Sequence, residues 1–260
     1  ATRVMQAMVG YDEADPITKR GTDQEEVDYT KFLEADGLKD ARIGVLRELS
    51  EADVHPEISA LFNQALVDME GLGATIVDPV VVPNFTELRK GQWCETFRAD
   101  LEDFLDTYVK NDSIATLEDV VRIGSNNDYA RRNVEFSLTK EGRYGDLPAH
   151  CGDVYTDARR IAYREAIERT MDSLQLDAIV YPSWNHPPAL IDSFETQYLG
   201  DNSQIICPHT GQPGFSVPMG YTTGNQPAGI QFLGRMWSEP TLVKLCYGFE
   251  QGTLHRKEPE

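Results

Sequence analysis

The feature that most constrains the fold is an apolar strand, helix and strand pattern in residues 41–83. The segment ARIGVLREL (residues 41–49) has the Ile and Val content that is typical of a short buried strand. Pro56 suits the first turn of a helix, and ATIVDPVVVP (residues 74–83) predicts a second strand. Apolar residues at helical spacing follow the proline: Ile58, Leu61, Phe62, Ala65, Leu66 and Met69. Two strands joined by a helix favour a parallel crossover.

Helical spacing also marks the centre of the chain and its first residues. Residues 85–110 predict one helix with these residues on a single face: Phe97, Leu101, Phe104, Leu105 and Tyr108. Residues 154–174 predict a longer helix with these residues pointing inward: Ala158, Ile161, Ala162, Ile167, Met171 and Leu174. Between them, the polar segment 111–151 predicts short helices and loops. Val4, Met5 and Met8 also follow helical spacing, so we expect the chain to open inside a helix, as a fragment or a processed chain would.

The last third of the chain predicts three further strands and a closing helix. DAIVYP (residues 177–182) is a strand ended by its proline, and GFSVPMGY and AGIQFLGR flank the polar turn TTGNQP as a hairpin-like pair. Ser238 is placed to cap a final helix. The apolar positions of that helix are Leu242, Val243, Leu245, Cys246 and Phe249.

Strands separated by helices indicate an α/β fold in which a mixed β-sheet is flanked by helices on both faces. At 260 residues the chain is long enough to bury a sizeable core. We expect a single domain over residues 1–260, with a helical insertion at about residues 85–175.

The formal net charge of −19 argues against two classes of partner. Nucleic acids and anionic membranes both need clustered Lys and Arg, so we expect neither. The sequence shows no signal peptide and no apolar run that could span a bilayer. The four cysteines are scattered without a CxxC pair, which favours free thiols in a reducing compartment over disulfides. We therefore expect a cytoplasmic protein.

No catalytic constellation can be identified from the residues alone. The five histidines show no HxH or HExxH spacing, so we expect no metal, and neither a GxGxxG nor a P-loop motif indicates a cofactor. Ser216 lies in Gly214-Phe215-Ser216-Val217-Pro218, where the second glycine of a nucleophile elbow is replaced by proline; a strand residue is the better interpretation. The neighbours His150 and Cys151 could form a thiol and base pair, but such partners usually meet through the fold, so a structural role is favoured.

The C-terminal quarter nevertheless resembles a known family. DAIVYPS and the segment TGQPGFSVPMGYTTGNQPAGIQFLGRMWSEPTLVKLCYGFEQGTLHR are similar to the closing part of the amidase signature family. The matching positions are Gly211, Pro213, Ser216, Val217, Pro218, Gly220, Gly229, Gln231, Gly234, Arg235, Glu250, Gln251, Thr253, His255 and Arg256. QAMVGYDEADPIT and RIGVLRE also look like earlier segments of that family. The resemblance covers nearly the whole chain and is weakest at about residues 111–150.

This resemblance implies an amide hydrolase with a Ser–Ser–Lys triad. A nucleophilic serine attacks the amide carbonyl, a serine on a cis peptide relays the proton, an unprotonated lysine is the base, and backbone N–H groups hold the oxyanion. In the family these residues precede the part that this chain resembles, so no catalytic position is carried over. The expected fold is then an amidase-like core that is incomplete without an N-terminal half. Pro208 and Cys207 depart from residues common in the family, which leaves the substrate open.

A substrate pocket is expected where the DAIVYP strand ends and GFSVP begins, because ligands in open α/β sheets favour the carboxyl ends of strands. The candidate pocket residues are Ser183, Trp184, Asn185, Cys207 and His209. For Trp184, packing against the Pro187-Pro188 loop is an equal alternative. Trp93 is expected in the core.

Two functional hypotheses remain from the sequence. In the first, the chain is the C-terminal part of an amidase that cleaves the C–N bond of a small-molecule amide, needs no cofactor, and works beside an N-terminal half or within a homo-oligomer. In the second, it is a truncated, non-catalytic homologue that binds or assembles. Hydrolysis by the chain's own residues is the least favoured hypothesis. An exposed sheet edge and an apolar helix-packing face would drive association in either case.

Overall fold

The computed structural model describes residues 1–94, 96–139 and 152–258, and it divides the chain into two compact units. The first unit joins Ala1–Leu88 to Ala162–Glu260, and the second comprises Arg89–Ile161. The second unit lies within the range of the expected helical insertion. Whether the whole chain acts as a single domain stays a prediction.

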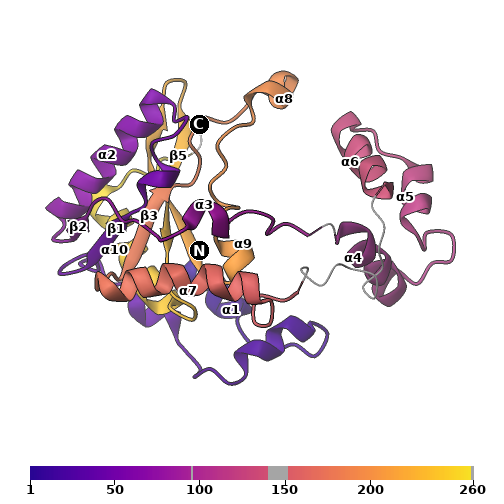
Figure 1. The fold of residues 1–260 in the computed structure, drawn as a ribbon, viewed down its shortest axis with the longest axis horizontal. Helices are drawn as coiled ribbons and strands as arrows, with labels where there is room; N and C mark the ends of the chain where they lie inside the picture. The colour runs from indigo at the N-terminus through magenta and orange to yellow at the C-terminus, as the bar shows by residue number, and fades with distance from the viewer. Residues whose placement is uncertain (95, 140–151, 259–260) are drawn as a thin grey trace. The chain divides into compact units, whose positions relative to one another are not determined.

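The first unit is built on a mixed sheet (Figure 1). Its strands are β1 (Arg42–Val45), β2 (Thr75–Val77), β3 (Ala178–Pro182), β4 (Gly214–Thr222) and β5 (Gln226–Leu233). Within the described residues the strand order is β2-β1-β3-β5-β4. β1 pairs in parallel with β2 and with β3, and β5 pairs antiparallel with β3 and with β4. The predicted parallel crossover and hairpin are both confirmed.

One face of the sheet packs against α2 (Pro56–Gly71) and α10 (Glu239–Thr253). Five of the six predicted apolar positions of α2 are buried, with Phe62 and Met69 at most 1% exposed, and Leu61 is partly buried. All five predicted apolar positions of α10 are buried as well. Ser238 is the N-cap residue of α10, but its hydroxyl donates to the Arg235 carbonyl instead of capping the helix.

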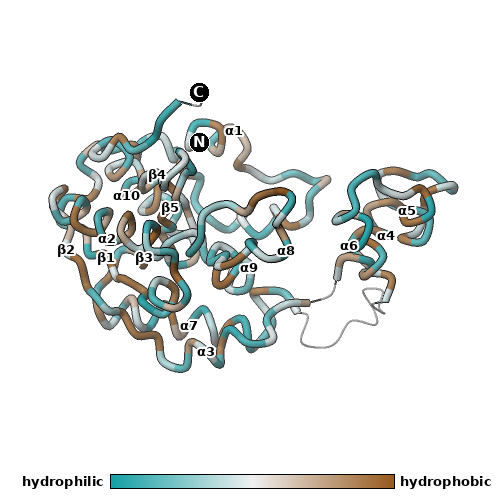
Figure 2. The backbone as a smooth tube through the Cα atoms, turned by 90° about the horizontal axis from the view of Figure 1, so that it is seen from above, coloured by the Kyte–Doolittle hydropathy of each residue, from teal (hydrophilic) through white to brown (hydrophobic). Residues whose placement is uncertain are grey.

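The other face packs against α7 (Ala158–Ser173), so helices cover both faces as expected. Ile167 and Met171 of α7 are fully buried against this face, together with Tyr163. The prediction for Ala158 was wrong, because this residue at the first position of the helix is exposed. Figure 2 shows the hydrophobic character of the chain along β1 and β3, which lie between the two helical layers.

Short elements complete the first unit. They are α1 (Thr2–Met8), η1 (Pro16–Gly21), η2 (Tyr29–Phe32), η3 (Arg47–Leu49), α3 (Phe85–Leu88), η6 (Ile191–Ser193), α8 (Phe194–Gln197) and α9 (Cys207–Thr210). α1 confirms the expected opening helix, yet it buries none of its own residues. In the part of the chain that the structure describes, no helix has the length and apolar character to cross a membrane.

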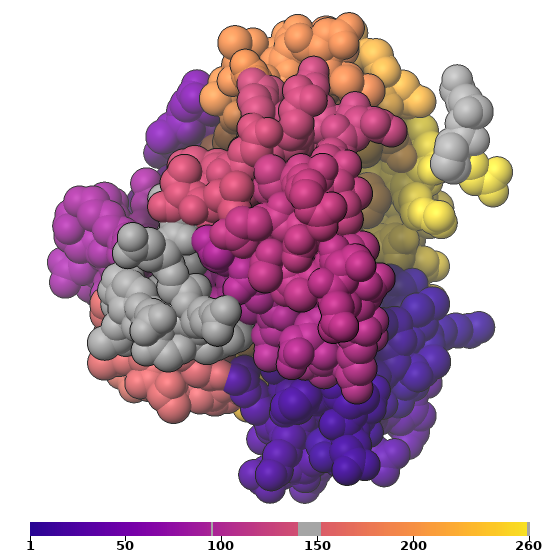
Figure 3. Space-filling view, turned by 90° about the vertical axis from the view of Figure 1, so that its right-hand side faces the viewer, coloured from indigo at the N-terminus to yellow at the C-terminus, as the bar shows by residue number. Residues whose placement is uncertain are grey.

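The second unit consists of short helices, as predicted for most of its length. They are α4 (Phe97–Phe104), η4 (Leu105–Val109), α5 (Leu117–Ile123) and α6 (Asp128–Leu138), shown in magenta and pink in Figure 3. Thr116 and Asp119 form a capping box at the start of α5. Arg98 of α4 donates to Glu118 of α5 at 2.6 Å, which ties these two helices together.

Two predictions for this region were wrong. The single helix expected over residues 85–110 is interrupted after Leu88, and Gly91 adopts a φ of +62° that does not fit a right-handed helix. Trp93, expected in the core, is 64% exposed. The expected apolar face is only partly buried: Leu105 is buried, whereas Phe97, Phe104 and Tyr108 are more than half exposed.

The cysteines differ in their covalent state. Cys207 and Cys246 are free thiols, as expected. Cys94 is disulfide-bonded, so the prediction of a free thiol was wrong at this position. The neighbours His150 and Cys151 lie outside the described residues.

Candidate functional site

The carboxyl ends of β1 and β3 are joined by a buried asparagine, Asn202. Its Nδ2 lies 2.8 Å from the Leu49 carbonyl after β1, 2.9 Å from the Pro182 carbonyl that ends β3, and 2.9 Å from Oδ1 of Asn185. Asn202 is 3% exposed, so these contacts are shielded from water. Asn185 is buried too, and its carbonyl accepts from the His55 N–H at 2.8 Å. The network therefore fixes the loops that follow two neighbouring parallel strands.

Ser183 comes directly after β3 and faces the hairpin. Its backbone N–H donates to the Gly229 carbonyl of β5 at 2.8 Å, which continues the β3–β5 ladder by one residue. Its hydroxyl lies 2.9 Å from the hydroxyl of Ser216 on β4. Gly229 lies between the two serines in the sheet, and a Cβ there would come within 3.1 Å of the Ser183 hydroxyl. A side chain at position 229 would therefore crowd the Ser183 hydroxyl.

Cys207 lies beside the same face of the sheet. Tyr181, Gln231 and Ser216 are register neighbours across β3, β5 and β4, and Gln231 donates from Nε2 to the Cys207 Sγ at 3.2 Å. Burial raises the pKa of the Cys207 thiol, so the protonated form dominates at neutral pH. Burial likewise raises the pKa of Tyr181. A Cβ at Gly214 would lie 2.5 Å from this sulfur, so a larger residue there would displace the Cys207 side chain.

The remaining candidates lie in two different places. Trp184 is half-buried, and its ring packs edge-on against Tyr198 with centroids 4.8 Å apart. It also forms an isolated bridge with Asp201, in the loop that carries Asn202. His209 is buried in α9, two residues after Cys207. The structure thus brings Ser183 and Cys207 to one face of the sheet, while Trp184 and Asn185 belong to the loop after β3.

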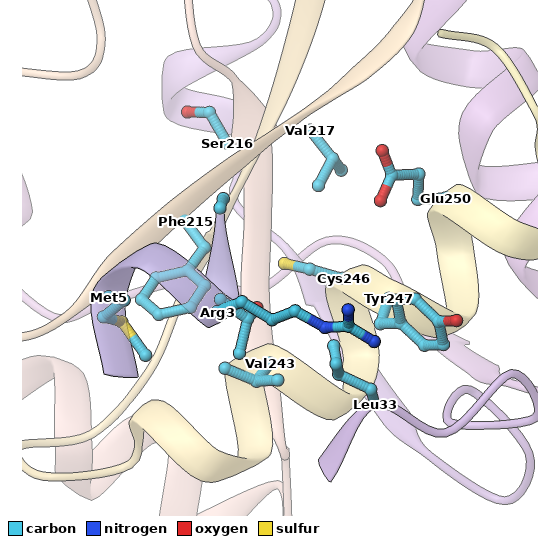
Figure 4. A pocket seen from close by; sticks show the side chains of 12 residues that line it. Arg3, Met5, Leu33, Phe215, Ser216, Val217, Val243, Cys246, Tyr247 and Glu250 are labelled. Atoms are coloured by element: carbon cyan, nitrogen blue, oxygen red, sulfur yellow. The ribbon is translucent and has the colours of Figure 1, made fainter. Parts of the chain in front are cut away.

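A cavity of about 550 Å³ lies between α1, α10 and β4 (Figure 4). Its apolar lining includes Met5 of α1, Phe215 and Val217 of β4, and Val243, Cys246 and Tyr247 of α10. The five predicted pocket residues do not line this cavity. Ser216 belongs both to the lining of this cavity and to the serine pair, because its hydroxyl contacts that of Ser183. The assignment of the five residues to a substrate pocket stays a prediction.

Sequence reasoning missed Asn202, Gln231 and Tyr181. Asn202 lies in a polar loop and has no motif around it, so its role appears only when the ends of β1 and β3 are brought together. Gln231 was noted only as a family position, whereas alternation along β5 places it on the same face as Ser216. Within the described ranges, no three His, Cys, Asp or Glu residues are arranged to hold a metal ion.

A mixed sheet covered by helices on both faces, with polar side chains where β3 and β4 lie on either side of β5, defines an α/β protein. The sequence profile of the Amidase family matches residues 1–243. The chain therefore belongs to the amidase family.

Individual relatives agree with this assignment. A protein named as a probable amidase of Arabidopsis thaliana is 27% identical over 275 residues, covering 100% of this chain and 48% of that protein. A glutamyl-tRNA(Gln) amidotransferase subunit from Myxococcus xanthus is 30% identical over 86% of this chain and 47% of its own length. The crystal structure of the peptide amidase of Stenotrophomonas maltophilia superposes with a TM-score of 0.74 at 28% identity, over 100% of this chain and 52% of that enzyme. The chain spans about half the length of the relatives it matches.

Proposed function

We propose that residues 1–260 form the C-terminal part of an amidase that hydrolyses a carboxylic amide. In this proposal a serine oxygen attacks the carbonyl carbon, the C–N bond breaks, and the amine leaves with a proton; water then releases the acid. The nucleophilic serine, the serine on a cis peptide and the lysine lie in polypeptide outside these residues. The resemblance of the closing segment to the amidase signature family implies this division.

The observation that carries the proposal is the match to the amidase family over residues 1–243, with about half of each relative left unmatched. The serine pair supports the same division. The hydroxyls of Ser183 and Ser216 bond to each other, and among the described residues neither accepts a hydrogen bond from Lys or His. A serine hydroxyl without a base is a weak nucleophile, so this pair does not form a triad by itself.

We place the substrate beside the loop after β3 and the first residues of α9. Ser183 and Asn185 supply hydrogen-bonding groups there, and Trp184 supplies an apolar wall. Cys207 and His209 shape the opposite side. Such a mixture of apolar walls and a few fixed polar groups is usual for small-molecule sites.

The proposed partners are a small-molecule amide and a second protein segment, either an N-terminal amidase half or another copy of the chain. Several relatives are named as amidotransferase subunits, which favours work within an assembly for this chain as well. We propose the cytoplasm as its location. The second candidate function is a non-catalytic module for binding or assembly, favoured by the lack of a base next to the serine pair among the described residues.

The experiment is reconstitution. The chain is assayed for ammonia release from simple amides, alone and joined to an amidase N-terminal portion that carries the serines and lysine. We expect release only from the joined protein, and loss of release when the supplied nucleophilic serine is changed to alanine. A folded joined protein that cleaves no amide would favour the binding or assembly module.

A further inference from the structure

The beginning and the end of the second unit are tied together by two arginines of α7. Arg159 donates from Nη1 to the Gly91 carbonyl at 2.6 Å. Its neighbour Arg160 donates from Nη2 to the Gln92 carbonyl at 3.3 Å. Each bond joins positions 68 residues apart in the sequence, so the first turn of α7 holds the segment through which the chain enters the unit. We call the two joined segments the neck: Gly91–Cys94 and Asp157–Arg160.

A disulfide sulfur and an arginine meet in the neck. Cys94 is half-buried and disulfide-bonded, and Nη2 of Arg160 lies 3.8 Å from its Sγ. Among the described residues no carboxylate pairs with the Arg160 guanidinium, whereas Asp157 lies 3.2 Å from Nη2 of Arg159. A cation beside a cysteine sulfur stabilises the thiolate that forms when a disulfide is reduced. Arg160 is therefore placed to make the Cys94 disulfide easier to reduce.

The helices of the second unit bury little apolar surface. In the described part of this unit the buried apolar residues are Ala99, Leu105 and Leu117. Phe97 and Phe104 of α4 are more than half exposed. A small unit with so weak a core commonly depends on a covalent cross-link for its stability. We therefore expect the disulfide to contribute a large share of the stability of this unit.

We propose that the Cys94 disulfide is a reversible redox switch that sets the stability of the second unit. The reductant is a dithiol. One of its thiolates attacks the sulfur bonded to Cys94, the S–S bond breaks, and Cys94 leaves as a thiolate beside Arg160. The second thiolate of the reductant then attacks the mixed disulfide, the other cysteine leaves, and the dithiol becomes a cyclic disulfide. Two electrons pass from the dithiol to the protein, and the two protons of the dithiol pass to the protein sulfurs or to solvent.

The oxidised and reduced states differ in how the second unit is held together. In the oxidised state the cross-link restricts the unfolded chain and adds to the bonds from Arg159 and Arg160. In the reduced state those noncovalent bonds remain alone, so α4, α5 and α6 open more often. The first unit has two apolar core clusters of its own and should not respond. In a reducing compartment, such as the cytoplasm proposed above, disulfides are rare and are usually transient or redox-sensing.

Hydrogen exchange of the 260-residue chain, before and after reduction with dithiothreitol, tests the switch. We expect the amides of α4, α5 and α6 to exchange about tenfold faster, or more, after reduction, and those of α2 and α10 to be unchanged. Cys94→Ser cannot form the cross-link and should exchange like the reduced chain with or without dithiothreitol. The matched control Cys246→Ala removes a free thiol of the first unit, and its α4, α5 and α6 amides should still respond to reduction.

The contribution of Arg160 is measured separately, as the thiol–disulfide equilibrium of Cys94. The chain is equilibrated at pH 8 with mixtures of reduced and oxidised dithiothreitol and then alkylated, and mass spectrometry gives the fraction of Cys94 in the disulfide. Arg160→Ala should shift the equilibrium constant about tenfold toward the disulfide, because the thiolate loses its cation. Arg160→Lys keeps the positive charge and should shift it less. Arg169→Ala, a change at an exposed arginine of the same helix, is the control and should cause no shift.

Equal exchange of α4, α5 and α6 in the oxidised and reduced chains would overturn the switch, and so would a Cys94 that stays a free thiol in oxidised dithiothreitol. Equal acceleration in α2 and α10 would contradict a switch confined to the second unit. An unshifted equilibrium constant for Arg160→Ala would show that Arg160 does not stabilise the thiolate. If Cys94→Ser fails to fold, the oxidised and reduced wild-type chains decide, because they share one sequence.

Discussion

At the scale of single residues, Asn202 has more acceptors around its amide nitrogen than it has protons to donate. Three oxygens lie within 2.9 Å of Nδ2, which carries two hydrogens. Asn202→Ala would leave buried carbonyls without a donor, and we expect a loss of about 1–3 kcal/mol in the free energy of unfolding. Urea unfolding measures the loss. Gln204→Ala, an exposed change in the same loop, is the control and should be close to neutral. Equal stability of both variants would contradict the role of Asn202.

A substitution of Trp184 tests whether this residue lines the proposed substrate pocket. In the reconstituted enzyme Trp184→Ala should change KM across a series of amides, because the ring would line the substrate site. Trp184→Phe keeps an aromatic ring against Tyr198 and should retain more of the wild-type pattern. Michaelis constants for at least three amides provide the measurement. Unchanged kinetics for every substrate would remove Trp184 from the site and leave packing as its role.

Cys207 gives a prediction about reactivity. Burial raises the pKa of its thiol above the usual 9.0, so the reactive thiolate is scarcer at pH 8 than in an exposed cysteine. We expect iodoacetamide to alkylate Cys207 slowly in the folded chain and rapidly in urea. Mass spectrometry of the labelled chain measures both rates. Rapid labelling without denaturant would show that the sulfur is open to solvent, contrary to its contact with Gln231.

At the scale of elements, close backbone packing positions α10. A Cβ on Gly248 would lie 2.9 Å from the Gly37 nitrogen and 3.0 Å from that of Leu38, and backbone cannot easily move away. Gly248→Ala should therefore destabilise the fold by about 1–3 kcal/mol through overpacking. Gly71→Ala is the matched control, since a Cβ there meets nothing within 4 Å. Thermal unfolding compares them, and a neutral Gly248→Ala would show that α10 can shift.

The contact between α2 and the hairpin turn is sensitive to pH. Glu57 at the start of α2 accepts from the backbone N–H and the hydroxyl of Thr223, and the backbone bond is the main cause that lowers its pKa from 4.5. A lowered pKa in the folded state adds stability above pH 4.5 that is lost as the pH falls through the folded value. Glu57→Gln should flatten this part of the acid unfolding profile. An unchanged profile would mean that the exposed contact contributes nothing measurable.

The elements that the sequence predicts well are those with a clear period and buried neighbours. Periodicity predicts α2, α10 and the hairpin, because each buries one face against the sheet. β2 is shorter than its apolar run, since Pro79 and Pro83 have no N–H to extend a ladder. The helix predicted over 85–110 does not form as one element, because Gly91 has a positive φ. Most of the large apolar residues on its predicted face are exposed, so little burial favours a continuous helix. The Asn202 network could not be predicted, because it joins segments more than 150 residues apart.

At the scale of the whole molecule, the chain belongs to the amidase family and spans about half the length of its relatives. The α/β fold was predictable from the alternation of strands and helices, and the family from residues at fixed spacing in the closing segment, which forms the hairpin and α10. The division into two units was not predictable from periodicity, since the helices of residues 89–161 carry the same apolar spacing as core helices while exposing much of it.

Ammonia release by the purified 260-residue chain, without any other polypeptide, is the most direct measurement of the central claim. The claim is that these residues form walls and framework while the reacting serine and lysine come from elsewhere. We predict no release above the uncatalysed rate for any simple amide. Hydrolysis by the chain alone, abolished by Ser183→Ala or Ser216→Ala, would contradict it.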